Sequence, residues 1–543
     1  MQPQANTLVT DRSWDNLFED QPLVERFLRD VFPNYLLNCR WFGGKSSRIK
    51  NYRLEYLTEF PTPEKKVYIT IIETVFYTSK TARYLLPISY YNGDPGKVPD
   101  AAIITPIKIG NEVGLLMDAL YSASFRNTMF RQLYTSAEVP FDPGVLAFRS
   151  GKVLREEVTN MEVQSRLLDA DQSNTTVVFN EEYYLKIYRR LFRETNPDLE
   201  LTHFLSERAA FKNSPAFAGS INWEREALPD ISIGLMQKRV EHEDNAWDYF
   251  LGHSKAFFER VKASGLDPSS LQRTGRHRPL RISKIRPQMI ELIGRDALVG
   301  VQNLARRTAQ MHIGLSSDKY DRHFHPEGFN GDYAVWLKNR LNYQFDQRYH
   351  LAEQSLDKLE DLPKVYAERF LEQKNEIKNY ILAFDDGKLN SKRIRIHGDF
   401  HLGQVLVNED DFFILDFEGE PESTIRDRKI KQPPIKDVAG MLRSFHYAIY
   451  ANIFNHGEGL GFTQEVLFDT GENYYNFISS VFLHTYIKTA MANGLDIGYS
   501  NEIHYLLTYH MLEKAIYEMG YELNARPKWV VIPLMGIMRM LDS

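Results

Sequence analysis

Residues 394–421 read "IRIHGDFHLGQVLVNEDDFFILDFEGEP", and this stretch decides which fold to expect for the chain. Its apolar runs "QVLVN" (404–408) and "FFILDF" (412–417) are separated by the acidic residues 409–411. Two short apolar runs with turn residues between them are typical of a β-hairpin. Because "HGD" is a turn-forming sequence, the stretch predicts a polar loop followed directly by strand, turn and strand.

Three polar side chains of this stretch match the needs of phosphoryl transfer to a hydroxyl group. Such a transfer uses a carboxylate that accepts the hydroxyl proton and oxygen ligands that hold a divalent cation on the phosphates. Asp399 is followed five residues later by Gln404, the offset between base and amide ligand in a kinase catalytic loop. Gln404 replaces the usual Asn, but its carbonyl oxygen can still bind magnesium. Asp416 ends a buried apolar run and is the second candidate metal ligand.

The same stretch has two other interpretations. His397 and His401 could be metal ligands of a hydrolase, but further histidines at ligand spacing are not evident. The aspartates could also be ordinary turn residues, since Asp is common in turns. The combination of Asp399, Gln404 and Asp416 around one hairpin favours the kinase-type interpretation, with His397 as a support of the loop.

Upstream residues predict the other half of a nucleotide site. "VVFNEEYYLKIY" (177–188) is typical of a hairpin and places Lys186 on a strand between apolar residues. An ammonium group there needs an anionic partner, and Glu200, on the helix predicted to follow Asn196, is the expected one. The loop "DQSNTTVVF" (171–179) has no glycine, yet its backbone N–H groups and hydroxyls can bind phosphate. The loop residues expected to do so are Gln172, Ser173, Asn174 and Thr175.

Composition excludes several classes of protein. The net charge of −6 argues against a nucleic-acid partner, and the basic run 273–286 is interpreted as a solvated linker rather than an anion site. Cys39 is the one cysteine of the sequence, so neither a disulfide nor a multi-cysteine metal site can form. No secretory signal and no apolar run of about 18 residues is evident, so no membrane association and a cytoplasmic location are expected.

The chain changes character twice along its length. Residues 1–135 mix helical spacing with strand-like runs, and we interpret them as an N-terminal cap subdomain. Residues 136–244 are rich in predicted strands, and residues 245–543 are mostly helical apart from the opening hairpin. The expected fold class is α+β, with a sheet-rich part followed by a helical lobe that carries the catalytic loop.

Several stretches beside the opening one have a familiar sequence and order. They are "RWFGGKSSRI" (40–49), "DQSNTTVVF" (171–179), "LKIYRRL" with "NPDLE" (185–200), "RIHGDFHLGQVLV" (395–407), "ILDFEGEP" (414–421), "KDVAGMLRSFHYA" (436–448) and "LEKAIYEMGYELNARPKWVVIPL" (512–534). On these pieces the chain resembles bacterial maltokinases, including the kinase part of trehalose synthase–maltokinase fusions. The resemblance covers nearly the whole chain.

The resemblance implies a bilobal, protein-kinase-like fold of the aminoglycoside-phosphotransferase type, with a cap subdomain in front. It implies ATP and Mg²⁺ as cofactors and transfer of phosphate to the anomeric hydroxyl of maltose, which feeds α-glucan synthesis from trehalose. Asp399 would be the base, Gln404 and Asp416 the magnesium ligands, and Lys186 the phosphate lysine paired with Glu200. Trehalose synthase would be a fused or associated partner.

The sugar contacts of the family match residues near the C-terminus: Lys514, Tyr517, Glu518, Tyr521 and Arg526. The first four, at offsets 0, 3, 4 and 7, share one face of a helix. Tyrosine offers an apolar plane with a hydroxyl, which suits a sugar. Taken without the resemblance, the same pattern is typical of an amphipathic helix with tyrosines in the core and charges in solvent.

Two further motifs are noted. Asp437 and Arg443, in "KDVAGMLRSF", are expected mainly to support the catalytic loop from a helix. "RWFGGK" (40–45) is a hallmark of the family for which the sequence suggests packing and a tight turn rather than chemistry.

Other functions stay open at this stage. A kinase of the same fold acting on glucose or glucosamine is the nearest alternative. An aminoglycoside kinase is disfavoured because Lys514 and Arg526 would repel a polycation. A non-enzymatic pseudokinase is disfavoured because Lys186, Asp399 and Asp416 are all present.

Overall fold

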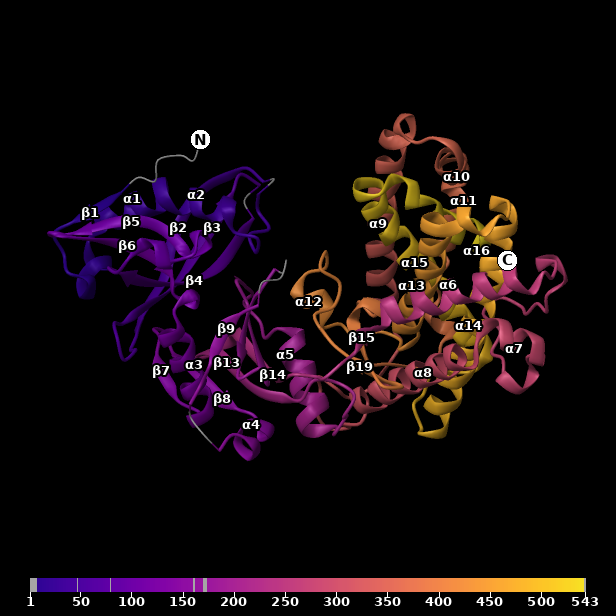
Figure 1. The fold of residues 1–543 in the computed structure, drawn as a ribbon, viewed down its shortest axis with the longest axis horizontal. Coiled ribbons are helices and arrows are strands. Elements are labelled where there is room, and N and C mark those ends of the chain that lie inside the picture. The colour runs from indigo at the N-terminus through magenta and orange to yellow at the C-terminus, as the bar shows by residue number, and fades with distance from the viewer. Residues whose placement is uncertain (1–6, 46, 79, 160–161, 169–172, 542–543) are drawn as a thin grey trace. The chain divides into compact units, whose positions relative to one another are not determined.

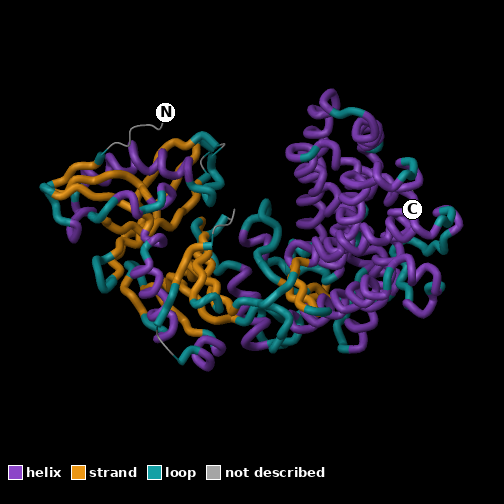
Figure 2. The backbone as a smooth tube through the Cα atoms, in the orientation of Figure 1, coloured by secondary structure: helices purple, strands orange, loops and turns teal. Residues whose placement is uncertain are grey.

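The structure, a computed structural model, describes residues 7–45, 47–78, 80–159, 162–168 and 173–541. The chain forms two compact units (Figure 1). The first unit comprises Met1–Glu207 and Pro215–Arg239, and the second comprises Arg208–Ser214 and Val240–Ser543. Strands dominate the first unit and helices the second (Figure 2), as the sequence predicts.

The N-terminal part of the first unit is built on a mostly antiparallel sheet with the order β1-β5-β6-β4-β3-β2 and β12 beside β4. Long apolar or alternating runs explain these strands, because such side chains suit a sheet with a buried face. Two short helices, α1 (Gln21–Arg26) and α2 (Phe32–Asn38), bury their apolar side chains in the same core as the sheet. The strands are β1 (Leu8–Thr10), β2 (Ile49–Phe60), β3 (Val67–Phe76), β4 (Thr81–Tyr91), β5 (Ile103–Ile109), β6 (Glu112–Asp118) and β12 (Arg190–Leu191).

A second sheet of the first unit has the order β7-β8-β13-β14-β11-β10-β9. The expected hairpin forms between β10 and β11, with left-handed backbone at Asn180 and Glu181 in its turn. The helices α3 (Ala123–Thr135), α4 (Lys152–Glu157) and α5 (Pro197–His203) accompany the sheet. Its strands are β7 (Glu138–Pro140), β8 (Val145–Ser150), β9 (Ser165–Leu167), β10 (Thr175–Phe179), β11 (Tyr183–Ile187), β13 (Phe217–Arg225) and β14 (Leu228–Lys238).

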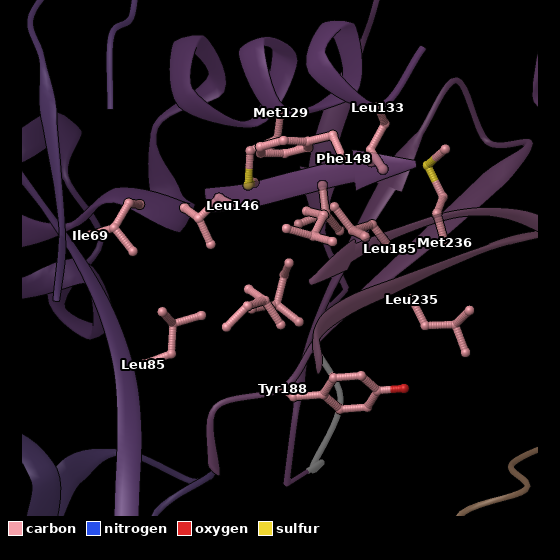
Figure 3. Packing of buried hydrophobic residues seen from close by; sticks show 14 of the residues in the cluster. Ile69, Leu85, Met129, Leu133, Leu146, Phe148, Leu185, Tyr188, Leu235 and Met236 are labelled. Carbon is pink, nitrogen blue, oxygen red and sulfur yellow. The ribbon is translucent and has the colours of Figure 1, made fainter. Parts of the chain in front are cut away.

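The two sheets of the first unit share one hydrophobic core. Ile69 of the N-terminal sheet lies beside Leu146 of β8, as Figure 3 shows, and Leu85 and Phe148 belong to the same cluster. The same cluster reaches Leu185 on the strand that carries Lys186. The cap is therefore packed onto the sheet of the predicted nucleotide site through continuous apolar contacts.

Helix α13 (Ile435–His456) is the centre of the second unit. Every residue from 435 to 453 is buried, which is typical of a helix surrounded by protein. It packs against α6, α14 and α15. The further helices of the unit are α6 (Ala246–Ser264), α7 (Pro287–Ile293), α8 (Arg295–Leu315), α9 (Gly331–Ser355), α10 (Asp361–Glu372), α11 (Lys374–Leu382), α12 (Ile425–Arg428), α14 (Gln464–Ala492), α15 (Ser500–Ala525) and α16 (Val531–Leu541).

The opening stretch forms the predicted hairpin in this unit. Strand β18 (Val405–Asn408) pairs with β19 (Asp411–Ile414), and the short β15 (Asp244–Asn245) extends the sheet. The small pair β16 (Glu327–Gly328) and β17 (Lys392–Arg393) lies elsewhere in the unit. Among the described residues, no helix is long and apolar enough to cross a membrane.

The basic run 273–286 differs from the solvated linker that the sequence predicts. It runs along α14, where the Leu280 N–H donates to the Ser480 carbonyl at 3.0 Å and His277 Nε2 lies 2.9 Å from the Tyr475 hydroxyl. Arg273 forms an ion pair with Asp469. Hydrogen bonds to α14 thus hold the segment in place, although several of its basic side chains are exposed.

Candidate active site

The carboxylate of Asp437 holds the predicted catalytic loop. It accepts hydrogen bonds from the backbone N–H groups of His397 and Gly398, at 2.8 and 2.9 Å, and from His312 Nε2 at 3.0 Å. Burial alone would raise the pKa of Asp437, but the interactions with His312, His397 and the Gly398 N–H together outweigh burial and lower that pKa. The expected support of the loop by Asp437 is therefore present.

Two glycines let the loop approach this helix. Gly398 has φ +85°, a backbone conformation that favours glycine. A Cβ on Gly440 of α13 would lie 2.6 Å from the carbonyl oxygen of Phe400. The loop can therefore lie this close to α13 only because position 440 has no side chain.

Both histidines of the loop bind backbone groups. His397 Nε2 lies 2.8 Å from the Leu415 carbonyl oxygen, which ties the loop to the end of β19. His401 Nδ1 accepts from the Gly403 N–H at 3.1 Å and caps the short turn Leu402–Gln404. Burial lowers the pKa of His401 to about 4, so its ring is neutral at pH 7. These roles agree with a loop support and give no reason to invoke a histidine-bound metal.

Asp399, the candidate base, forms an ion pair with Lys514 of α15. The Nζ–Oδ1 distance is 2.8 Å, and both side chains are 16% exposed. Burial by itself would raise the pKa of Asp399, but the Lys514 ammonium outweighs burial and lowers it. The sequence placed Lys514 on the sugar, and the structure adds that it touches the candidate base.

Gln404 and Asp416 lie at the same end of the hairpin. The Leu415 N–H donates to the backbone carbonyl of Gln404 at 2.9 Å, so Asp416 follows immediately beyond this pair. Asp416 has φ +54°, a left-handed conformation that is uncommon outside glycine and recurs at functional sites. An amide and a carboxylate oxygen are donors that suit Mg²⁺, so this pair fits the predicted metal.

Lys186 of the first unit pairs with a residue that the sequence did not name. Its Nζ lies 2.9 Å from Oδ2 of Asp198, whose side chain is 1% exposed. The sequence named Glu200 instead. Successive helical positions are about 100° apart, so Asp198 and Glu200 point in different directions, and Lys186 faces the former. Asn196 caps the helix as expected, accepting from the Asp198 N–H at 2.9 Å.

The predicted phosphate loop leads into β10. Gln172 lies outside the described residues; Ser173 and Asn174 lie in a bend, and Thr175 begins the strand. Arg189 Nε donates to the Thr175 hydroxyl at 2.7 Å, and its Nη2 donates to Asp118 at 2.5 Å. The loop is thereby joined to the end of β6 in the cap.

The "RWFGGK" motif has a structural role at this junction. The Trp41 ring lies against the Arg189 guanidinium, with 5.1 Å between the guanidinium carbon and the ring centroid. Tyr35 donates from its hydroxyl to Asp118 at 3.2 Å. Trp41 therefore helps to enclose the buried pair of Arg189 and Asp118, a function that the sequence alone did not reveal.

Helix α15 carries four of the predicted sugar residues, of which Lys514 contacts Asp399, and the fifth, Arg526, follows its last residue. The Lys514 ammonium lies 4.8 Å from the Tyr517 ring centroid, and burial raises the pKa of Tyr517 to about 12. Tyr521 is 59% exposed, with the Arg526 guanidinium 5.3 Å from its ring centroid. An exposed Tyr521 does not fit the alternative in which the tyrosines of this face fill the core.

Glu518 corrects the role expected for Arg443. Arg443 Nη2 lies 2.5 Å from Oε2 of Glu518, and the arginine side chain is fully buried. The sequence placed Arg443 mainly at the catalytic loop, whereas it holds a predicted sugar residue on α15. Arg443 stands six residues after Asp437 on α13, so the two side chains point to different neighbours.

Comparison with known proteins gives a consistent picture. The family model of the maltokinase N-terminal cap domain matches residues 35–121. A glucosamine kinase of Streptacidiphilus jiangxiensis is 24% identical over 253 residues, which is 47% of this chain and about half, 52%, of that protein. A solved glucosamine kinase in complex with glucosamine, ADP and inorganic phosphate superposes with a TM-score of 0.61 at 15% identity, covering 98% of this chain and 100% of that chain. Crystal form A of glucosamine kinase gives 0.59 at 16% identity, with coverages of 91% and 92%.

These likenesses define the class of the protein by its fold. The chain has the bilobal, kinase-like fold that the sequence predicts, since the similarity to a solved kinase extends over nearly the whole length of both chains. Within that fold, residues 35–121 match the maltokinase N-terminal cap domain.

Proposed function

We propose that the protein phosphorylates maltose at its anomeric hydroxyl, with ATP as the donor, to give maltose 1-phosphate. The observation that carries this proposal is the maltokinase-type cap at residues 35–121. A kinase-like fold and an aspartate in the predicted catalytic loop agree with it. The product would feed α-glucan synthesis from trehalose, and trehalose synthase, fused or associated, would supply maltose in the cytoplasm.

Asp399 is the proposed base. Its carboxylate accepts the proton of the sugar hydroxyl while that oxygen attacks the terminal phosphorus of ATP and ADP leaves. Lys514 favours the ionised form of Asp399, as a base requires. The fixed backbone of His397 and Gly398 keeps Asp399 in place without reorganisation during the reaction.

The phosphate side of the reaction is assigned to the residues that the sequence predicts for it. Gln404 and Asp416 would hold Mg²⁺, which neutralises charge on the phosphates when bound. Lys186, fixed by Asp198, would bind a phosphate oxygen. The loop residues Gln172, Ser173, Asn174 and Thr175 are proposed to contact phosphates through backbone N–H groups and hydroxyls, and Glu200 stays a predicted member of this site.

The sugar is assigned to α15. Tyr517 and Tyr521 would pack against the sugar rings, and Glu518 and Arg526 would bind hydroxyls. Glu518 is held by Arg443, and Arg526 lies 2.7 Å from Glu522. Each polar side chain is therefore fixed before the sugar arrives, which reduces the entropy lost on binding.

Glucosamine is the second candidate acceptor. The similarity to glucosamine kinases in sequence and fold favours it. Charge argues against it, because an amino sugar is a cation and would meet Lys514 next to the reacting hydroxyl. Maltose has no such charge and is therefore preferred.

A panel of sugars with ATP tests the proposal. ADP release is measured for maltose, glucose and glucosamine, and the product is identified by phosphorus NMR. Maltose should be turned over with the highest kcat/KM and give a signal of an anomeric phosphate. Turnover of glucosamine without turnover of maltose would replace maltose by the second candidate, and ATP turnover with none of the sugars would overturn the function.

A further inference from the structure

Behind Asp399 and Lys514 lies a group of ionisable side chains, four buried and the fifth, Arg340, 19% exposed. It is here called the ion cluster: Arg340, Glu420, Lys436, His510 and Glu513. Its members come from α9, from the segment after β19, from α13 and from α15. Charged groups are rarely buried without partners, because removal from water is costly. The cluster therefore needs an explanation that the proposed chemistry does not yet give.

Arg340 is the bridging member of the cluster. One terminal nitrogen of its guanidinium donates to Glu513, and the other donates to Glu420. Lys436 Nζ supports the same two carboxylates, at 2.9 Å from Glu513 and 3.5 Å from Glu420. His510 Nδ1 lies 2.7 Å from the second oxygen of Glu513. The planar guanidinium can hold two carboxylates at once, which a lysine cannot do with the same geometry.

Each carboxylate of the cluster belongs to a segment with a predicted function. Glu513 directly precedes Lys514 on α15, here called the sugar helix. Glu420 stands four residues after Asp416 in the segment 416–421, here called the metal loop. Lys436 directly precedes Asp437, which holds the backbone of the catalytic loop. Arg340 thus joins the metal loop to the sugar helix at the place where α13 holds the catalytic loop.

The cluster is not itself a ligand site. The cavity between Asp399, Glu420, Lys436 and His510 has a volume of about 10 Å³, which is room for about one water molecule. A sugar or a nucleotide cannot enter it. The cluster must act on the reaction through the segments that it connects.

We propose that Arg340 is a positioning residue that fixes the metal loop relative to the sugar helix. The inference rests on the proposed function. Without the guanidinium, Lys436 would face two buried carboxylates, and their repulsion would separate Glu420 from Glu513. The metal loop and the sugar helix would then move apart, and with them Asp416 and Lys514.

The test compares Arg340→Gln and Arg340→Lys with a control, Lys378→Gln. Lys378 pairs with Asp346 of the same helix, α9, at 2.7 Å, but the two side chains are 30% and 35% exposed, so water compensates the loss of this pair. For each variant four quantities are measured: the affinity for ATP with Mg²⁺ by calorimetry, the sugar KM, kcat, and the melting temperature.

Arg340→Gln should lower kcat by about 10- to 100-fold, weaken the affinity for Mg²⁺ and ATP, and raise the sugar KM. Arg340→Lys should restore part of each loss, because lysine brings back the positive charge but not the planar guanidinium that donates to two carboxylates. Lys378→Gln should keep all four quantities at the wild-type value. A merely structural role predicts a lower melting temperature with unchanged affinity and sugar KM.

Two single-arm variants keep the test decisive if Arg340→Gln does not fold. Glu420→Gln should weaken the affinity for Mg²⁺ and ATP more than it raises the sugar KM, and Glu513→Gln should do the reverse. If the wild type phosphorylates a sugar but Arg340→Gln, or these two variants, keep the wild-type affinity, sugar KM and kcat, the inference is overturned and the proposed function stands. A wild type that turns over no sugar would overturn the proposed function and the inference with it.

Discussion

The two units bury charge in different ways. In the first unit, Arg189 and Asp118 form a pair with both side chains 1% exposed, and the neighbours that they contact include the neutral side chains of Tyr35, Thr175 and Trp41. In the second unit, charges of both signs lie close together along α13 and α15. The Lys514 ammonium, for example, is influenced by three carboxylates, Asp399, Glu420 and Glu518.

This difference has a physical consequence. When one member of an isolated buried pair is removed, its partner is left as an unpaired charge, which is strongly destabilising. In a cluster, the remaining members can compensate part of the lost charge. We therefore expect mutations of the first unit's pair to act mainly on stability, and mutations in the second unit's cluster to act mainly on the positions of functional groups.

The largest expected effect is that of Asp399→Asn on turnover. The amide cannot accept the hydroxyl proton, so kcat should fall by about 10³-fold. In this variant the Lys514 ammonium still has the carboxylates of Glu420 and Glu518 nearby, so the melting temperature should change little. Binding of ATP with Mg²⁺, measured by calorimetry, should survive. Loss of nucleotide binding would count against Asp399 as the base, and a large loss of stability would contradict the idea that the cluster compensates.

Asp118→Asn tests the other side of the comparison. It leaves the buried Arg189 without a charged partner, and we expect the unfolding free energy of the first unit to fall by about 3–5 kcal/mol. Amide hydrogen exchange in β6, β10 and β11 measures this loss locally. Glu181→Gln is the control, because the pair that Glu181 forms with Arg166 is more than half exposed, and the same amides should keep their protection. Equal effects of the two variants would remove the distinction between buried and exposed pairs.

The pH dependence of stability sharpens the description of the second unit. Burial lowers the pKa of His446 to about 4, in a site shared with Glu472 and Arg443. An unfolded histidine has a pKa of about 6.5, so between these values the unfolded chain binds a proton that the native chain does not. Stability contributed by the neutral ring is therefore present above pH 6.5 and is lost as the pH falls to about 4.

Denaturant unfolding at pH 7 and pH 4.5 measures this loss. His446 should account for about 2 kcal/mol of it, and His446→Gln should remove that share. His350→Gln, at an exposed position of α9, should keep the wild-type difference between the two pH values. If His446→Gln shows the wild-type difference in stability between the two pH values, other groups carry the pH dependence.

Lys514→Met should have the smallest of these effects. Loss of one charged contact should raise the sugar KM by about tenfold, with little change in the KM for ATP. Because Lys514 lowers the pKa of Asp399, its removal should also move the acid limb of the pH–rate profile to higher pH. An unchanged sugar KM would take the sugar helix out of the site.

Local features of the chain were predictable from the sequence. The hairpin after the catalytic loop follows from two apolar runs and an acidic turn, and the spacing of Asp399, Gln404 and Asp416 is set by that hairpin. The strand position of Lys186 also follows from local alternation. Such features depend on neighbours within a few residues, which a sequence pattern records.

Other features depend on contacts between distant segments. Lys514 and Asp399 are 115 residues apart, and Arg340 and Glu513 are 173 apart, so no spacing rule connects them. The pairing of Lys186 with Asp198 depends on the direction in which a helix faces its strand. The role of Trp41 became visible only with Arg189, which lies far along the chain.

The segment Arg208–Ser214 gives the chain an unusual connectivity, because it leaves the first unit, lies in the second and returns. Asn213 anchors it there, donating from its side chain to Asp411 at 3.1 Å and accepting from the Ile414 N–H at 2.9 Å. The backbone therefore passes between the units at three points, so one cut cannot separate them. A fragment of the chain that ends at residue 239 would contain the heptapeptide Arg208–Ser214 without the segments of the second unit that this heptapeptide contacts. After limited proteolysis at one of these points, the two peptides should stay associated through non-covalent contacts, because each of them still crosses into the other unit or contacts a segment that does.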